Sequence, residues 1–499
     1  MESRGCQKQK TPLVIFFWVG AAPPDQRTMT APLKAARYGL MTQSISSGTS
    51  PRGSLAAARS GPLSGEIVVP GDKSMSHRAL MIAALAQGET QIAGLLEGDD
   101  VLATARALGA LGVTIERKEG AGWSVRGLGI GGLKAPEGVL DLGNSGTGVR
   151  LLMGILATHP FTSVLSGDAS LSHRPMARVS DPLSDMGAGF DARDGSFLPL
   201  TVHGTGAPVP IEATLKQASA QVKSAILLAA LNTPGLTRVI EPKPTRDHTE
   251  TMLAFFGAHI KTESTSQGGR LITIEGQPEL TSPGQVTIPG DISSAAFALV
   301  AGLVVPGSKL TIRNIGLNPL RTGLLETLLE MGGDIKIENE RTEAGEPVGD
   351  IVVHASDLKG VNVPAARAPT MIDEYPILAV AAACARGQTR MEGVGELRVK
   401  ESDRIKIMAE GLRASGVMVD EGEDWFAVQG QGEENGRSGP KGGACVATHL
   451  DHRIAMSFLI LGLVSENPIS VDDATPIATS FPGFADLMAE LGAKIGETV

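Results

Sequence analysis

The stretch "IVVPGDKSMSHRALMIAALAQGETQIAGL", residues 67–95, returns in altered form as "VTIPGDISSAAFALVAGLVVPGSKLTIRNI", residues 286–315. Each copy reads as a β-type run, a Pro-Gly-Asp turn, a serine at the start of an apolar helix, a glycine and a second β-type run. Similarity of this length indicates an internal duplication, because repeated architectures keep their turns and helix starts in register. We therefore expect a strand, a helix and another strand in both copies.

A glycine that ends a predicted helix recurs through the whole chain and marks six units. The six positions are Gly112, Gly187, Gly257, Gly332, Gly416 and Gly492. Glycine suits the helix end because it adopts positive φ without strain, and a β-type run follows each one. A unit of this size cannot bury both of its faces alone, so neighbouring units must share a core.

These repeats predict an α/β fold of two similar domains with three units each. The first domain is expected to span residues 71–284. The second is expected to take residues 285–499 together with a short strand from residues 63–70. The Pro-Gly-Asp turns at Gly71 and Gly290 are the expected crossings between the domains, and the cleft between the domains is the expected ligand site.

Composition excludes several classes of protein. The net charge is −10 and aromatic residues make up 3%, which argues against a nucleic-acid partner. No segment reaches the apolar run of about eighteen residues that a membrane helix needs. The three cysteines have neither metal nor disulfide spacing, so we expect a reducing compartment and a cytoplasmic protein.

The first 62 residues differ from the rest of the chain. "LVIFFWVGAA", residues 13–22, resembles the core of a signal peptide, and the Ser-, Arg- and Ala-rich part that follows is typical of a linker or transit segment. We expect an N-terminal extension that is disordered, or an over-long start with Met29 or Met41 as the true first residue.

Lys73 and Ser74 stand at the start of the first repeated helix and suggest an anion site. A helix start offers free backbone N–H groups and a positive dipole end, to which Lys73 adds a charge and Ser74 a hydroxyl donor. Arg78 lies one helical turn after Ser74, on the same face. The loop is not a nucleotide-binding P-loop, since Asp72 precedes Lys73 where that motif has glycine. A capped helix with solvated charges remains the alternative.

Similar helix starts follow in the other units. They bring the glycine-rich loop at residues 143–148, Arg174, Ser219, Gln221, Arg246, Lys400, Arg404 and Arg453. Asp373 and Glu401 are the carboxylates placed for proton transfer among these cations. His449 and His452 have no third ligand nearby in the sequence, so we expect no metal. The pattern predicts a small ligand, or two ligands, with several negative charges.

Seven blocks in order resemble those of the 5-enolpyruvylshikimate-3-phosphate (EPSP) synthase family: "PGDKSMSHR", "LGNSGTGVR", "SLSHRPMARV", "SAQVKSAILLA", "MIDEYP", "LRVKESDR" and "LDHRIAMSF". The resemblance runs from about residue 63 to 494, and the sequences of these blocks are most similar to those of the class II branch. It implies two inside-out, barrel-like α/β domains of three βαβαββ units each. It also implies transfer of the enolpyruvyl group of phosphoenolpyruvate to the 5-hydroxyl of shikimate 3-phosphate through a tetrahedral intermediate, with release of phosphate and no cofactor.

The resemblance also implies roles for single residues. The catalytic residues would be Asp373, Glu401 and Lys73: Asp373 would act on the 5-hydroxyl proton, Glu401 would serve proton transfer at the enol methylene, and Lys73 would lie between both substrates. The site for shikimate 3-phosphate would comprise Lys73, Ser74, Arg78, Ser219, Ala220, Gln221, Arg246, Asp373 and Lys400. The site for phosphoenolpyruvate would comprise Lys73, Gly146, Arg174, Gln221, Arg404 and Arg453.

Several points stay open at this stage. Many members have lysine before the final "FP", whereas this chain has Ser480, so one phosphate contact is in question. Some class II members tolerate glyphosate and have alanine at the position of Gly146, so glycine here favours a sensitive target. A non-catalytic anion-binding scaffold, a UDP-sugar enolpyruvyl transferase and an RNA-end cyclase are the alternatives. We expect a monomer.

Overall fold

The computed structural model describes residues 53–118, 122–432 and 439–497, which build two hydrophobic cores. One core is made by side chains between Met75 and Ile288, and we call this part the N-lobe. The other is made by side chains of residues 57–69 and 292–493, and we call it the C-lobe. Each lobe carries three four-stranded sheets, which gives one sheet for each of the six predicted units.

The second unit shows the pattern that all units share. Its elements are β6 (Leu140–Asp141), α3 (Gly146–Ala157), β7 (Thr162–Ser166), α4 (Ala177–Asp185), β8 (Gly189–Arg193) and β9 (Phe197–His203). The sheet order is β6-β7-β9-β8. The first pair is parallel and the two others are antiparallel. This is the βαβαββ arrangement that the resemblance implied.

The other two N-lobe units have the same order. The first consists of α1 (Lys73–Leu85), β3 (Gln87–Ala93), α2 (Asp99–Ala110), β4 (Thr114–Lys118) and β5 (Gly122–Leu128), with β14 (Gln285–Thr287) as its parallel edge strand. The third consists of β10 (Glu212–Thr214), α5 (Ala220–Ala230), β11 (Leu236–Glu241), α6 (His248–Phe255), β12 (Ile260–Ser264) and β13 (Arg270–Glu275).

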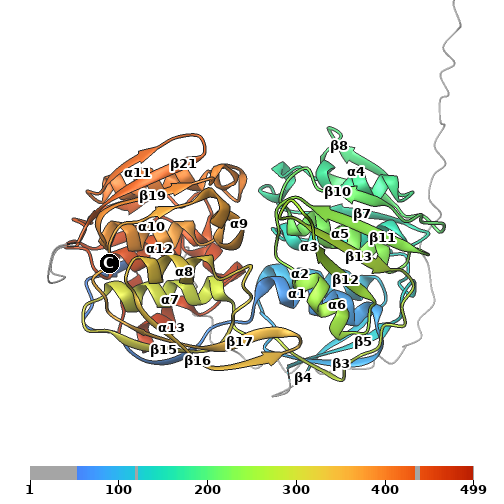
Figure 1. Cartoon of the computed structure of the whole chain (residues 1–499), viewed down its shortest axis with the longest axis horizontal. Helices are drawn as coiled ribbons and strands as arrows, with labels where there is room; N and C mark the ends of the chain where they lie inside the picture. Colours follow the sequence, from blue (N-terminus) through green and yellow to red (C-terminus); the bar gives the residue numbers. More distant parts are fainter. Residues whose placement is uncertain (1–52, 119–121, 433–438, 498–499) are drawn as a thin grey trace, which may run out of the picture. The chain divides into compact units, whose positions relative to one another are not determined.

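The C-lobe repeats the pattern three times more (Figure 1). The fourth unit has β2 (Ser64–Val68), α7 (Ile292–Val304), β15 (Lys309–Gly316), α8 (Gly323–Glu330), β16 (Asp334–Glu343) and β17 (Glu346–His354). The fifth has β18 (Asn362–Val363), α9 (Ala368–Met371), α10 (Tyr375–Cys384), β19 (Arg386–Glu392), α11 (Arg404–Ala414), β20 (Met418–Glu421) and β21 (Trp425–Gln431). The sixth has β22 (Cys445–Val446), α12 (His452–Gly462), β23 (Ile469–Val471), α13 (Phe484–Glu490), β24 (Lys494–Glu497) and β1 (Leu55–Ala58).

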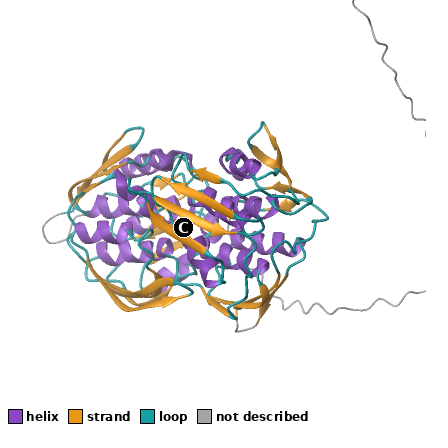
Figure 2. Cartoon of the chain, turned by 45° about the vertical axis from the view of Figure 1, so that its right-hand side comes forward, coloured by secondary structure: helices purple, strands orange, loops and turns teal. Residues whose placement is uncertain are grey.

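One helix of each unit, the first in every unit but the fifth, where the short α9 precedes it, lies inside its lobe. Helices α1, α3 and α5 in the N-lobe are buried along almost their whole length, as are α7, α10 and α12 in the C-lobe. Figure 2 shows the strands on the outside of the helices. A helix that is buried all round must be apolar all round, which explains the Ala- and Leu-rich sequences of these six helices. The inside-out α/β fold is thereby confirmed.

The six helix-ending glycines have the predicted conformation. Their φ angles run from 85° at Gly416 to 105° at Gly187, in the left-handed region that other residues avoid. Each glycine turns the chain from the last helix of its unit into the following strand or loop.

The two Pro-Gly-Asp turns lie against each other. Gly71 and Gly290 form an antiparallel bridge. The amide of Asp72 donates to the Pro289 carbonyl at 2.8 Å, and the amide of Asp291 donates to the Pro70 carbonyl at 2.9 Å. The chain thus passes between the lobes twice at one place.

The predicted boundaries need two corrections. Residues 55–58, which we expected in the extension up to residue 62, form β1 between β23 and β24, and their Ser- and Ala-rich surroundings gave no strand pattern. Residues 285–287, which we expected in the second domain, pair with β3 of the N-lobe. With these shifts we keep the two-domain division as a proposal, which the two cores support. Residues 1–52 lie outside the described part.

Among the described residues, no helix is both long and apolar enough to cross a membrane. Cys384 is partly buried and Cys445 is exposed, and neither forms a disulfide. Cys6 falls in the stretch that is not described.

Candidate active site

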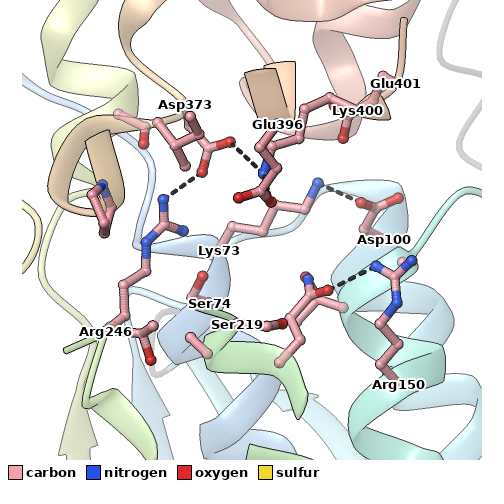
Figure 3. A pocket seen from close by; sticks show the side chains of 18 of the residues that line it. Lys73, Ser74, Asp100, Arg150, Ser219, Arg246, Asp373, Glu396, Lys400 and Glu401 are labelled. Atoms are coloured by element: carbon pink, nitrogen blue, oxygen red, sulfur yellow. Dashed lines mark hydrogen bonds and ion pairs between the residues drawn. The ribbon is translucent and has the colours of Figure 1, made fainter. Parts of the chain in front are cut away.

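One cavity receives the starts of all six buried helices. Figure 3 shows part of its lining, with Lys73, Ser219 and Asp373 around it. From the N-lobe it is lined at the starts of α1, α3 and α5, and from the C-lobe at the starts of α7, α10 and α12. The free N–H groups and dipole ends of these helices favour negative charge. The lining side chains include nine lysines and arginines but only five aspartates and glutamates, although the whole chain has a net charge of −10. The cavity is therefore a local focus of positive charge.

Helix α1 brings Lys73, Ser74 and Arg78 to the cavity. The Lys73 ammonium forms an ion pair with Asp100, whose side chain is 7% exposed. Arg78 is buried and donates to the Ser74 carbonyl at 2.9 Å and to Thr249 Oγ1 at 2.7 Å. Burial lowers the pKa of Arg78 to about 10, so its guanidinium stays charged at neutral pH.

The glycine-rich loop brings Gly146 and, one helical turn later, Arg150. Ser145 caps α3 by accepting from the amide of Gly148 at 3.0 Å. Arg150 Nη1 donates to Gln221 Oε1 at 2.7 Å, which links α3 to the start of α5. Burial, followed by the nearby guanidinium groups, lowers the pKa of Arg150 to about 9. The guanidinium groups on this side of the cavity thus repel one another in the absence of a ligand.

Arg174 approaches the same side of the cavity from the turn before α4. Its Nη2 donates to Asn144 Oδ1 at 2.6 Å, and its Nη1 lies 3.8 Å from Glu401 Oε1 of the C-lobe. A methyl group on Gly146 would lie 3.1 Å from the Arg174 guanidinium. Glycine therefore leaves room beside this cation.

The start of α5 lines the cavity with Ser219, Ala220 and Gln221. Ser219 caps the helix by accepting from the amide of Val222 at 3.4 Å. Gln221 Nε2 donates to Thr147 Oγ1 at 3.0 Å. The predicted contact residues of this helix therefore share one turn.

Asp373 lies opposite these N-lobe side chains and is surrounded by cations. Arg246 donates to its Oδ2, Arg404 Nη1 is 3.5 Å from its Oδ1, and Lys400 Nζ is 4.0 Å from the same oxygen. Burial acts to raise the pKa of Asp373, but Arg246, Lys400 and two further arginines outweigh it and hold the pKa well below its usual range. Asp373 is therefore ionised and able to accept a proton.

Glu401 and Arg404 form a second charged group beside Asp373. Arg404 is almost completely buried and donates to Glu401 and to Asp451 Oδ2, the latter at 2.8 Å. Burial acts to raise the pKa of Glu401, whereas Arg404 and Arg174 lower it well below its usual range. Glu401 is thus also ionised when the cavity holds no ligand.

Arg453, at the start of α12, completes the C-lobe wall. Its Nη1 lies 3.8 Å from Glu374 Oε1. The adjacent His452 is buried, and burial together with Arg453 lowers the pKa of His452 to about 3, so this imidazole is neutral at physiological pH. No group of three potential metal ligands occurs among the described residues.

The predicted site residues come together with one exception. All but Arg404 line the cavity, and Arg404 lies behind Asp373 and Glu401 instead. Ser480, at the end of the 3-10 turn Thr475–Thr479, is not part of the lining. Sequence reasoning missed Asp100, Arg150, Arg178, His248, Arg321, Pro369, Ile372, Glu396 and Val399, which also line it. The helical spacing that singled out Arg78 after Ser74 also holds for Arg150 after Gly146 and could have found it.

Comparison with known proteins gives one consistent result. The family model of EPSP synthase (3-phosphoshikimate 1-carboxyvinyltransferase) matches residues 57–488. A 3-phosphoshikimate 1-carboxyvinyltransferase of Paramagnetospirillum magneticum is 60% identical over 441 residues, which cover 88% of this chain and 98% of that protein. The protein of the same name from Parvibaculum lavamentivorans is 59% identical over 441 residues, covering 88% and 96%. A solved EPSP synthase of Acinetobacter baumannii superimposes with a TM-score of 0.81 at 43% identity and covers 90% of this chain and 100% of its own.

Proposed function

Because the chain belongs to the EPSP synthase family, we infer that it transfers the enolpyruvyl group of phosphoenolpyruvate to the 5-hydroxyl of shikimate 3-phosphate and releases phosphate. It is a 3-phosphoshikimate 1-carboxyvinyltransferase of the shikimate pathway, which leads to chorismate and the aromatic amino acids. The identity spans both lobes and nearly the full length of the relatives, so the alternative scaffold, UDP-sugar and RNA functions are set aside.

One observation carries this function at the level of the site: cations from both lobes converge on two ionised carboxylates in a single cavity. Each substrate carries a phosphate and a carboxylate, so four anionic groups must be held together. Arginine and lysine bind such groups with charge-assisted hydrogen bonds. Holding both reactants in one cavity also removes much of the entropic cost of their meeting.

We propose that shikimate 3-phosphate binds mainly to the N-lobe. Its phosphate would meet Ser219, Ala220 and Gln221 at the start of α5, and Ser74 and Arg78 of α1 would complete that side. The full proposed set is Lys73, Ser74, Arg78, Ser219, Ala220, Gln221, Arg246, Asp373 and Lys400. The capped starts of α1 and α5 support this placement.

We propose that phosphoenolpyruvate binds where the two lobes face each other. The proposed set is Lys73, Gly146, Arg174, Gln221, Arg404 and Arg453. Arg404 is bound to carboxylates in the free protein. We propose that its guanidinium turns partly away from these carboxylates when the anionic group of phosphoenolpyruvate arrives, and binds that group instead. The Arg404 guanidinium comes next to the cavity where it contacts Glu401, because Glu401 lines the cavity directly.

The proposed chemistry has two steps with balanced protons. In the first, Asp373 accepts the 5-hydroxyl proton, the hydroxyl oxygen bonds to C2 of phosphoenolpyruvate, and Glu401 delivers a proton to C3. In the second, the bond between C2 and the phosphate oxygen breaks, C3 returns its proton to Glu401, and the leaving phosphate takes up the proton held by Asp373. The ionised state of Asp373 supports its role as base.

Glu401 must gain a proton before it can donate one. In the free protein Arg404 and Arg174 keep it ionised. A phosphate and a carboxylate arriving beside the same arginines would offset their charge and raise the pKa of Glu401. Substrate binding would in this way allow Glu401 to take up the proton that it later donates.

We propose that the reaction needs no cofactor, since proton transfer and anion binding account for both steps. A monomeric protein in the cytoplasm is also proposed, on the sequence arguments above. Size-exclusion chromatography with light scattering tests the oligomeric state.

Phosphate release from phosphoenolpyruvate, measured with and without shikimate 3-phosphate, tests the function. Turnover should require both substrates. Lys73→Met and Asp373→Ala should each reduce it by roughly 10²-fold or more, the usual scale of a lost charge contact to the transition state for Lys73 and of a lost acid–base group for Asp373. Lys261→Met and Asp191→Ala, at side chains that are 71% and 81% exposed, are the matched controls. Near-full activity of the two site variants would refute the site assignment.

A further inference from the structure

Arg321 lies where the two crossing segments meet, in the loop between β15 and α8. Its side chain is 3% exposed and lines the cavity. The guanidinium donates to Asp72 Oδ2 at 3.1 Å, to Asp291 Oδ1 at 3.2 Å and to Ser293 Oγ at 2.8 Å. Asp72 belongs to the first crossing and Asp291 to the second, so one buried side chain joins both.

The two aspartates also fix the starts of two helices. Asp72 Oδ1 accepts from the amide of Met75 at 2.8 Å and caps α1. Asp291 Oδ1 accepts from the amide of Ser293 at 2.8 Å and caps α7. The second oxygen of Asp291 accepts from the backbone amide of Lys73 at 3.2 Å. The first residue of the N-lobe helix is therefore held by the cap of a C-lobe helix.

A second arm of contacts leads from Arg321 to Asp373. Ser293 accepts from Arg321 and donates to Glu374 Oε1. Glu374 is fully buried and directly follows Asp373 in the chain. Arg453 Nη1 lies 3.8 Å from the same Glu374 oxygen. The Arg321 guanidinium is thus linked both to the turn that carries Asp373 and to the start of α1.

The charges around Arg321 explain why an arginine is needed here. Burial acts to raise the pKa of Asp72, but Arg321 and weaker cationic neighbours outweigh it and lower the pKa to about 2. Burial and the charge of Asp72 raise the pKa of Asp291. Without Arg321, two neighbouring buried carboxylates would face each other with only weaker cationic neighbours, which is strongly unfavourable.

We propose that Arg321 is a positioning residue that holds Lys73 and Asp373 at a fixed separation across the cavity. It contacts no reacting atom in this role and acts through Asp72, Asp291 and Ser293. The proposal rests on the proposed function of Lys73 and Asp373 and goes beyond it, because it assigns a role to a side chain that already has protein partners. A guanidinium suits this role since it has several donors in a rigid plane, whereas a lysine ammonium cannot reach three acceptors in that geometry.

The test compares Arg321→Gln, Arg321→Lys and the double variant Arg321→Gln/Asp72→Asn by kcat, by KM for both substrates and by thermal unfolding. The double variant removes one of the two carboxylates along with the arginine, and Arg321→Lys keeps the charge, so folded protein is expected for both. We expect kcat to fall by roughly 100-fold in Arg321→Gln and in the double variant, because small misplacements of reacting groups cost about that much. KM for each substrate should stay within about threefold, since no binding contact is removed.

A variant that regains thermal stability without regaining kcat distinguishes a positioning role of Arg321 from a purely structural one. We expect the double variant to recover the melting temperature that Arg321→Gln loses without recovering kcat, and Arg321→Lys to remain at least about tenfold slower than the parent. If the double variant or Arg321→Lys turned over within about threefold of the parent, the proposal would be wrong. A large rise in KM at unchanged kcat would also overturn it and make Arg321 a binding residue.

Arg313→Gln is the matched control. Arg313 also joins two carboxylates, Glu66 and Asp350, but it is 37% exposed and does not line the cavity. Its loss should leave kcat unchanged. If the parent protein and this control showed no turnover, the proposed function would fail. Turnover in both together with an unaffected Arg321→Gln would refute the positioning role alone.

Discussion

Asp373 shows at the scale of a single residue how a carboxylate can work in a cavity built for anions. Arg246 reaches it from the N-lobe, while Lys400 and Arg404 reach it from the C-lobe. These cations hold the pKa of Asp373 low, although burial acts to raise it. The same cations are the proposed ligands of the substrates, so the carboxylate partly neutralises them until the substrates arrive.

Gly146→Ala tests the space beside Arg174. The added methyl group would lie 3.1 Å from the Arg174 guanidinium and 3.3 Å from that of Arg150, tighter than ordinary contact. Overpacking of this kind costs roughly 1–3 kcal/mol, which corresponds to about 5–150-fold in affinity. If glyphosate occupies this space, its half-inhibitory concentration should rise more than KM for phosphoenolpyruvate.

An inhibitor titration at several phosphoenolpyruvate concentrations measures this prediction. Gly138→Ala is the control, because a methyl group there meets no atom within 4 Å. Equal changes in both constants would show that the methyl group does not discriminate between the two ligands.

Asp72→Asn tests the pH dependence of stability. The pKa of Asp72 is about 2 in the folded protein and that of an unfolded aspartate is about 3.9. The folded state therefore favours the ionised form, and this stabilisation is complete above about pH 5 and is lost as the pH falls towards 2. Asparagine keeps the helix cap but removes the charge.

The difference in the free energy of unfolding between the parent and Asp72→Asn should reach at most about 2–3 kcal/mol near pH 7 and shrink below about pH 5. Urea unfolding at a series of pH values measures it. Asp185→Asn, at an exposed aspartate at the end of α4, should not alter the pH profile. A difference that stayed constant down to pH 3 would contradict the prediction.

Single residues differ in how far the sequence reveals them. Lys73, Ser74 and Arg78 were predicted because their spacing at a helix start has a physical meaning. Arg321 stands in a loop with no repeat and no helical spacing, and its partners come from two distant turns. Only the fold brings these carboxylates together, so no local pattern could have indicated this arginine.

At the scale of elements, α3 and α5 pack closely enough to require a glycine. A methyl group on Gly154 of α3 would lie 2.2 Å from the Ala225 carbonyl oxygen of α5. We expect Gly154→Ala to destabilise the fold by about 1–3 kcal/mol, because the backbones must separate. Gly109→Ala in α2 meets nothing within 4 Å and should stabilise by up to about 1 kcal/mol through helix propensity. Thermal unfolding of both variants measures the contrast, and equal melting temperatures would contradict it.

Lys223 links α5 to two other elements through buried charges. Its ammonium lies 3.0 Å from Glu241 Oε2 of β11 and 2.7 Å from Glu250 Oε1 of α6, and all three side chains are buried. It also donates to the Thr245 carbonyl at 3.3 Å, just before Arg246. Lys223→Met leaves buried carboxylates unpaired and should cost about 3–5 kcal/mol.

Denaturant unfolding measures this cost, and Lys223→Met/Glu250→Gln is the informative companion. Removing the second charge should return part of the lost stability, since one fewer carboxylate remains unpaired. Glu250→Gln alone gives the reference effect on the free energy of unfolding. If Glu250→Gln lowered the free energy of unfolding of Lys223→Met by the same amount as that of the parent, the two side chains would not interact and the prediction would be wrong.

The helices and strands were largely predictable because turns and caps are local. The Pro-Gly-Asp turns and the helix-ending glycines indicated six units, and each unit indeed has its helices ahead of the glycine. Strand β1 escaped because one leucine and three alanines give no strand pattern of their own, and they gain strand structure only by pairing with β23 and β24, which lie far away in the sequence. Long-range pairing is the information that local patterns lack.

At the scale of the whole molecule, the charge distribution sets how anions reach the cavity. The chain is acidic overall, while the cavity lining has a net excess of cations. Raising the ionic strength from about 0.05 to about 0.5 M should lower kcat/KM for both substrates several-fold, since the Debye length falls from roughly 14 to 4 Å. Initial rates in sodium chloride measure this effect, with sucrose of equal osmolality as the uncharged control. An unchanged kcat/KM would show that the local field does not attract the substrates.

The sixth sheet has a consequence for how the protein is made. Strand β1 leaves the ribosome long before both of its neighbours, β23 and β24, because nearly all other elements lie between them in the sequence. The N-lobe has all its strands once residue 287 has emerged. In the C-lobe, β1 therefore stays unpaired until β23 and β24 have been made, and an unpaired strand is exposed to aggregation and to chaperones during that interval.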